Sequence, residues 1–306
     1  MPMKVPPEEI KQIADCAPTL TRKGKRKSID RMISRHRTEM RKQINERMQR
    51  EMTLFDEALR FIIAFEEFIH STMPNKSRSS LAMTLGRIRG DLVSIRSLIE
   101  LGQESSALAV ARVFLEDLEI AMACCIDPEF SDLFLEFESG KEFWSKCVGY
   151  GKIYPLVERF FVCGWKDEKL AVSAIQHHRN LKNFLSDYIH LTASVAMRAT
   201  FPLALDKPGM LLYRPFRSIS EFAPPICLYV ADEIHAFSAC CINIFISPEP
   251  PPALANFDPC GELDDVLAAA HVLQELVIKY SDQLWSDYQN IRATWNEAFE
   301  IGADET

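Results

Sequence analysis

Apolar residues recur at every third or fourth position along most of the chain, which is the spacing of one face of an α-helix. No convincing run alternates apolar and polar residues as a strand does. We therefore expect an all-α fold, a multi-helix bundle with a long basic amphipathic helix near its N-terminus and a long C-terminal helix. The pattern predicts helices over about residues 28–70, 81–101, 105–126, 129–147, 153–162, 167–199, 226–246 and 262–300.

Prolines and glycines mark the ends of these helices. Gly102 and the pair Asp127–Pro128 stop two of them, and five prolines within residues 200–225 predict a long ordered excursion. The run SPEPPP at Ser247–Pro252 is the clearest linker. These boundaries predict a basic flexible segment (1–27), a helical domain (28–246), a Pro-rich linker (247–261) and a terminal helix (262–301).

The terminal helix has apolar positions separated by steps that alternate between three and four, with one break at Leu284. Such a heptad-like stripe suits a helix that packs along another helix of the same chain or along a twin subunit. The second arrangement is the basis for expecting a homodimer.

Composition places the chain among globular proteins with a large core, since 47% of its 306 residues are hydrophobic. Its nine cysteines include no CxxC or CxxxC pair, so we expect reduced thiols in a cytoplasmic protein, with no metal and no other cofactor. The N-terminus lacks the apolar segment of a secretory signal. The apolar stretch Ile226–Ile246 contains Asp232, Glu233 and His235, which predicts a buried helix and no membrane span.

Charge is distributed unevenly along the chain. Residues 22–50 contain 12 Lys or Arg and 3 Asp or Glu, so this segment carries +9 although the whole chain carries −8. Three interpretations fit: the segment meets an anionic partner such as RNA, docks on the acidic remainder, or forms a solvated helix face with a tail. Its stretch TRKGKRKS has no aromatic residue to stack on bases, so phosphates are the expected contact. The residues that we expect to bind nucleic acid are Lys23, Lys25, Arg26, Lys27, Arg35, Arg37, Arg41 and Lys42.

Two pairs of polar residues interrupt otherwise apolar helical stretches, and Arg112 with Glu116 is the first. They are four residues apart and therefore share a helix face. Three interpretations fit this pair. The two side chains form an ordinary ion pair, or the arginine reaches solvent along its aliphatic stem, or Glu116 holds the arginine rigid so that it can stabilise phosphate charge. Motifs for phosphate loops, zinc proteases, serine hydrolases and calcium loops are absent, which leaves acid–base chemistry or no chemistry.

Ser186 and His190 are the second pair, and Asp187 lies three residues before the histidine. A carboxylate near an imidazole raises its basicity, as acid–base catalysis requires, although a satisfied histidine near a helix end has the same sequence. Arg179 precedes His190 by eleven residues on the same predicted helix, which separates them by about 16 Å along the axis. Arg179 and His190 can act together only if a facing chain or another element brings their side chains to one site.

Arg112, Glu116, Ser186, Tyr188 and His190 carry a family resemblance that covers roughly residues 80–245. In their spacing the chain resembles a group of uncharacterised bacterial all-helical proteins, which is itself similar to the HEPN superfamily (higher eukaryotes and prokaryotes nucleotide-binding). The resemblance implies a HEPN-like core. Many HEPN proteins are dimeric, metal-independent ribonucleases, often toxins or phage-defence effectors. It also implies in-line attack of a ribose 2′-OH on its own phosphate, with a histidine that moves protons and an arginine that stabilises the anionic transition state.

The ribonuclease motif has four to six residues between an arginine and a following histidine. Here only Arg31 and His36 have that spacing, outside the matching region. Two hypotheses follow. The first is a non-enzymatic or regulatory protein of a HEPN-like family that binds a partner or nucleic acid, in a phage-defence or toxin–antitoxin setting. The alternative is a metal-independent ribonuclease that needs an arginine and a histidine in one open cleft at a dimer site. Its catalytic residues are drawn from Arg112, Glu116, Arg179, Ser186 and His190.

Overall fold

The computed structural model describes residues 29–72, 75–165, 167–189, 219, 222–255 and 261–303 of the chain. Within these residues every regular element is a helix and none is a strand, which confirms the all-α prediction. The chain divides into two units, Met1–Arg35 and His36–Thr306, and the packing described below lies within the second.

The helices follow the predicted ranges, with differences at their ends. They are α2 (Ile29–Arg47), α3 (Gln49–Ser71), α4 (Lys76–Glu100), α5 (Glu104–Ile126), α6 (Pro128–Glu136), α7 (Gly140–Phe143), α8 (Tyr154–Trp165), α9 (Glu168–Ile189), α11 (Ala223–Phe245) and α12 (Gly261–Ala303). A π turn at Trp144–Val148, a tight turn at Gly149–Gly151 and a 3₁₀ turn at Pro252–Leu254 join some of them.

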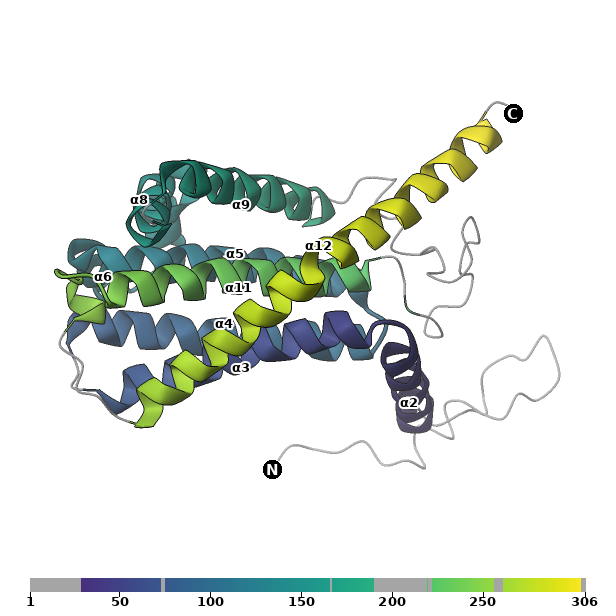
Figure 1. Cartoon of the computed structure of the whole chain (residues 1–306), viewed down its shortest axis with the longest axis horizontal. Helices are drawn as coiled ribbons and strands as arrows, with labels where there is room; N and C mark the ends of the chain where they lie inside the picture. Colours follow the sequence, from purple (N-terminus) through teal and green to yellow (C-terminus); the bar gives the residue numbers. More distant parts are fainter. Residues whose placement is uncertain are drawn as a thin grey trace, which may run out of the picture. The chain divides into compact units, whose positions relative to one another are not determined.

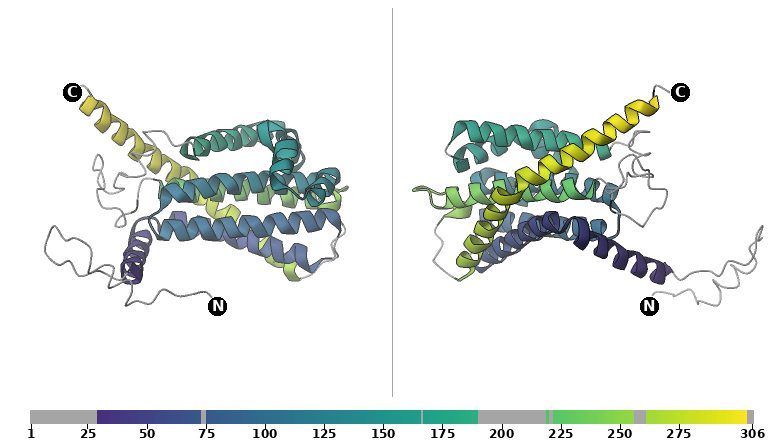
Figure 2. Two further views of the ribbon diagram at one scale, coloured as in Figure 1. Left: turned by 180° about the vertical axis from the view of Figure 1, so that it is seen from behind. Right: turned by 45° about the vertical axis from the view of Figure 1, so that its right-hand side comes forward.

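The core lies between α3, α4, α5 and α11, which pack side by side, while α12 crosses α3 and α11 (Figure 1). The pair α8 and α9 packs against α5 and α11, as the two views of Figure 2 also show. The largest fully buried side chains are mostly phenylalanines, including Phe55, Phe61, Phe114, Phe160 and Phe237. Ridges of these large side chains fill the grooves between helices and supply most of the apolar area removed from water.

The helix predicted over residues 28–70 is two helices. The backbone leaves the helical conformation at Met48, whose φ is −140° and ψ 36°, so α2 ends there and α3 begins. Met40, Ile44, Met48 and Met52 are all buried on both sides of this break. Because the apolar spacing of four continues across it, the pattern in the sequence contains no sign of the change in direction.

The helix predicted over residues 129–147 is also interrupted. Phe137 adopts an extended conformation that ends α6, and Ser139 then caps α7 by accepting a hydrogen bond from the backbone of Glu142. The predicted stop at Gly102 is present, because Gly102 has a φ of +62° and Gln103 N donates to Leu98 O over 2.9 Å. This left-handed cap satisfies the last carbonyls of α4 and turns the chain into α5.

Most residues of α11 are buried, consistent with the apolar stretch that predicts it. Within the described residues it is the one helix long and apolar enough to cross a membrane by length and composition, yet 67% of that window is buried inside the bundle. It carries Glu233 into the interior at 2% exposure. An ionised carboxylate in that position requires a partner, which is described with the site below.

The apolar stripe of α12 packs within the chain. Val266, Ala270, Leu273, Val277 and Leu284 are buried, and the helix lies against α3 and α11. As far as Tyr288, therefore, this stripe packs along helices of the same chain. Packing along a twin subunit, and with it the homodimer, stays a prediction.

The Pro-rich segment is anchored to the bundle where the structure describes it. Ala253 and Leu254 are buried, and Asn75 Nδ2 donates to Pro252 O over 3.3 Å. The Arg78 guanidinium donates to Ala255 O. Residues 252–255 therefore cover the beginning of α4.

Close approach of α8 and α11 depends on a glycine, and this gives the first prediction. A Cβ at Gly164 would lie 2.7 Å from the Cα of Cys240, so Gly164→Ala must push the two helices apart. We expect a loss of about 1–3 kcal/mol in the free energy of unfolding, measured with urea. Gly90→Ala is the control, because a Cβ there meets nothing within 4 Å and should add about 0.5–1 kcal/mol in a helix interior. Equal stability of Gly164→Ala and the natural chain would contradict the close approach.

Candidate functional site

Three of the predicted site residues meet between α5 and α9. Arg112 Nε donates to Ser186 Oγ over 3.1 Å, although the two residues are 74 positions apart. Arg112 Nη1 lies 2.9 Å from Glu116 Oε1, and the arginine side chain is only 14% exposed. Ser186 Oγ in turn donates to Lys182 O over 2.7 Å. The contact fixes the guanidinium of Arg112 on both sides.

Arg179 lies near this contact and makes different ones. Its guanidinium pairs with Glu158 of α8, and its Cζ lies 4.8 Å from the centroid of the Tyr154 ring. Lys182 Nζ lies 5.1 Å from the centroid of the same ring. Two cations of α9 therefore flank one tyrosine of α8, which gives each a cation–π contact.

The histidine at the centre of this region is His178, which the sequence pattern did not single out. Its Nδ1 lies 2.7 Å from Glu233 Oε2 and its Nε2 lies 3.1 Å from Glu119 Oε1. The three side chains are 1%, 2% and 0% exposed. Lys182 Nζ adds a second cation to Glu119, 2.7 Å from its Oε1. We call Glu119, His178, Lys182 and Glu233 the buried ion cluster.

The ion pairs of this cluster and its burial determine which of its side chains are protonated. Burial lowers the pKa of His178, but Glu233 and Glu119 outweigh it and raise the pKa to about 9. Burial also raises the pKa of the Glu119 carboxyl, but His178 and Lys182 outweigh it and hold that pKa below its usual value. Burial, assisted by Glu119, raises the pKa of Tyr154 to about 12. At neutral pH the cluster therefore contains an imidazolium, and the tyrosine beside it is protonated.

An imidazolium that donates from both nitrogens has no lone pair with which to accept a proton. His178 is also sealed from solvent, so it is not a general base for a substrate at neutral pH. The buried ion cluster instead holds α9 against α5 and α11 by charge. Among the residues that the structure describes, no group of three or more His, Cys, Asp or Glu is arranged to hold a metal ion.

The remaining predicted site residue lies outside the described part of the chain. His190 is not described, nor are the side chains of Asp187 and Tyr188. The meeting of an arginine and His190, which the ribonuclease hypothesis requires, therefore stays a prediction. His178 had one signal in the sequence: carboxylates such as Glu119 and Glu233 inside apolar stretches need cations. Which cation serves them depends on the fold.

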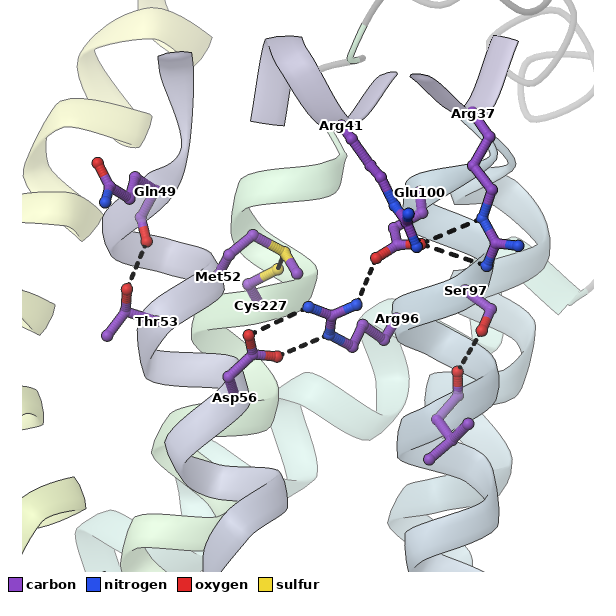
Figure 3. A network of polar contacts seen from close by, with 11 residues as sticks. Arg37, Arg41, Gln49, Met52, Thr53, Asp56, Arg96, Ser97, Glu100 and Cys227 are labelled. Atoms are coloured by element: carbon purple, nitrogen blue, oxygen red, sulfur yellow. Dashed lines mark hydrogen bonds and ion pairs between the residues drawn. The ribbon is translucent and has the colours of Figure 1, made fainter. Parts of the chain in front are cut away.

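The basic helix α2 makes the second candidate surface. Arg37 and Arg41 converge on Glu100 at the end of α4 (Figure 3), with Nη2 atoms 3.3 and 3.0 Å from Glu100 Oε2. Arg96 binds the same carboxylate and also donates from Nε to Asp56 over 2.8 Å. Burial raises the pKa of Glu100, but Arg41, Arg96 and Arg37 outweigh it, so the pKa lies below its usual value.

Two of the predicted nucleic-acid contacts thus dock on an acidic residue of the same chain. Arg37 and Arg41 keep 44% and 57% of their side chains exposed while they do so. Arg35 and Lys42 are exposed, and Lys42 lies 3.9 Å from Glu46. His36, of the Arg31–His36 spacing, bonds Leu101 O through Nε2 over 2.6 Å. Lys23, Lys25, Arg26 and Lys27 lie outside the described residues.

Comparison with known protein families, with curated proteins and with solved structures finds no match for the chain. The likeness to the HEPN superfamily therefore stays a prediction that rests on the five residues that carry it.

Charge on His178 predicts how stability depends on pH. Because its folded pKa is raised from the ordinary 6.5 to about 9, its contribution is complete below about pH 6.5 and is lost as the pH rises through about 9. The upper limit of this loss is about 3 kcal/mol. Urea unfolding at pH 6, 7.5 and 9.5 measures it. His178→Gln should be less stable and should lack this loss, whereas His70→Gln, at an exposed position of α3, should retain it. An equal pH dependence in the natural chain and His178→Gln would contradict the assignment.

Proposed function

We propose that the protein is a non-enzymatic helical binding protein that contacts the phosphates of nucleic acid through its basic N-terminal segment and α2. The observation that carries this proposal is the arrangement of Arg37 and Arg41. Glu100 fixes both guanidinium groups, yet about half of each side chain stays open to solvent. Fixed, exposed guanidinium groups bind phosphates with little loss of side-chain freedom.

Net charge supports the same conclusion. Arg37, Arg41 and Arg96 share two carboxylates, Glu100 and Asp56, which leaves one positive charge in that network. Residues 22–50 as a whole carry an excess of nine. Phosphate neutralisation of this kind gives binding that depends on salt and reads no bases directly.

A regulatory member of a HEPN-like family, in a phage-defence or toxin–antitoxin setting, is the biological context that we propose. Its support is the spacing of the residues that carry the resemblance, together with the contact that joins Arg112, Glu116 and Ser186. The non-enzymatic assignment is supported by the buried ion cluster, whose histidine is already protonated and inaccessible.

The second candidate function is a metal-independent ribonuclease, and the contact between Arg112 and Ser186 favours it. His190 follows Ser186 by four residues in the sequence, so a continued helix would place it one turn further along the same face. Its mechanism would use His190 to move protons and Arg112 to stabilise the phosphorane charge.

RNA cleavage separates the two functions. We expect micromolar purified protein to leave bulk RNA intact, because no accessible proton-transfer histidine lies beside Arg112 in the described residues. Gel electrophoresis with and without EDTA measures this. Cleavage that EDTA does not affect, that is lost in His190→Ala and that persists in His177→Ala would establish the ribonuclease instead. His177 of α9 is a suitable control because its side chain is 48% exposed.

Salt dependence tests the proposed binding. Replacing Lys23, Lys25, Arg26 and Lys27 by Gln should weaken binding to a labelled duplex. The slope of log K against log salt should fall by about 0.9 for each phosphate that the variant no longer neutralises. Arg35→Gln with Lys42→Gln should act in the same direction without disturbing Glu100. Fluorescence anisotropy at several salt concentrations measures both.

The matched control for these variants is Lys169→Gln with Lys279→Gln, which removes two exposed cations from α9 and α12. Its salt slope should equal that of the natural chain. If all three variants have the same salt slope as the natural chain, the basic segment and α2 do not bind the phosphates.

A further inference from the structure

The turn before α8 presents an aromatic side chain in an unusual backbone conformation. Tyr150 has φ 58° and ψ 28°, Gly151 has φ +81°, and Lys152 N donates to Gly149 O over 3.2 Å. Two successive left-handed residues inside such a bond form a type I′ turn, whose first central position favours Asn, Asp or Gly. A tyrosine there is sterically disfavoured.

Burial does not offset this conformational cost. Tyr150 is 88% exposed, so it adds almost nothing to the core. Its ring lies 5.6 Å from the ring of Trp144, at an angle of 63°, and Trp144 is itself 39% exposed. Local rules that are broken without a gain in packing are most often broken for function.

The indole of Trp144 is held by the backbone beneath it, and the ring of Tyr150 lies against that indole. A Cβ at Gly149 would lie 2.8 Å from Trp144 Cε3, so the indole packs directly on the glycine. Trp144 begins the π turn Trp144–Val148, and Lys152 Nζ donates to Ser145 O over 2.7 Å across the same loop. The two aromatic side chains therefore form a fixed surface, which we call the Trp144–Tyr150 surface.

The segment that carries this surface also contains three exposed lysines. Lys141, Lys146 and Lys152 are all exposed, and the carboxylates in the same stretch are Glu138 and Glu142, so residues 138–152 carry one net positive charge. Lys146 pairs with Glu142 over 2.5 Å, which leaves Lys141 and Lys152 to meet anions. An exposed ring beside lysines matches the chemistry of an unpaired nucleobase and its phosphates.

We propose that the Trp144–Tyr150 surface stacks unpaired bases of single-stranded nucleic acid. This inference rests on the proposed function and adds to it a contact with bases, which the aromatic-free basic segment does not provide. The two surfaces lie toward opposite ends of α4. Arg37 and Arg41 bind Glu100 at its end. Phe143, next to Trp144, packs on Phe130 of α6 with ring centroids 5.7 Å apart, and Asp132 of α6 lies 3.3 Å from Lys76 at the start of α4. The 25 residues of α4 separate these ends by about 37 Å, so each surface contacts its own stretch of strand.

The test compares a labelled oligouridine with a labelled duplex, using the full chain and fluorescence anisotropy. Tyr150→Asn removes the ring and installs a residue that the turn prefers, so the fold should be retained and its thermal midpoint unchanged or raised. We expect this variant to bind the oligouridine at least about fivefold more weakly and the duplex with unchanged affinity. Ile278→Ala, which truncates another exposed apolar side chain, should change neither.

Fluorescence provides a second readout that does not depend on affinity. Oligouridine should quench tryptophan emission of the natural chain, and Trp144→Phe should remove that part of the quenching. If the protein binds the duplex and Tyr150→Asn does not change the affinity for the oligouridine, this inference is overturned and the proposed function stays intact. Failure of both nucleic acids to bind at micromolar protein overturns both. A change only in self-association by light scattering overturns the inference in favour of a protein interface.

Discussion

Two carboxylates are buried in apolar helices, Glu119 of α5 and Glu233 of α11, and α9 brings to them the cations with which they pair. Removing one partner of such a buried pair leaves an uncompensated charge and costs several kcal/mol. His178 bridges both carboxylates and Lys182 adds a second cation to Glu119, so α9 has little freedom to slide or rotate. The position of the contact between Arg112 and Ser186 depends on this same docking.

A similar rule operates at the end of α4, with a different result. Glu100 is 7% exposed and receives Arg37, Arg41 and Arg96, but these cations stand at the rim and stay partly in solvent. In the buried ion cluster the charged side chains pair with one another, and no ligand can reach them because they are buried. At Glu100 the acid organises cations that remain open, which is why the proposed contact with phosphates belongs to α2.

Periodicity in the sequence predicts helices well where one face is apolar throughout, as in α4, α5, α11 and α12. It does not predict the break at Met48, because buried methionines keep the same spacing on both sides. The local pair of Arg112 and Glu116 is predictable, since residues four apart share a helix face. His178 was not identified, because its partners lie 59 and 55 positions away and only the fold brings them together. The aromatic pair Trp144 and Tyr150 was missed for a backbone reason, since no spacing pattern reports a left-handed tyrosine.

Attachment of α2 to Glu100 links two equilibria that are usually treated separately. A phosphate that draws Arg37 and Arg41 toward itself competes with Glu100 for the same N–H groups, so part of the interaction energy is used to weaken that attachment. By reciprocity, a phosphate bound to these arginines should weaken the attachment of α2 to the end of α4 by as much free energy as that attachment takes from the binding. The acid that holds the helix in place therefore also sets the affinity of the helix for its ligand.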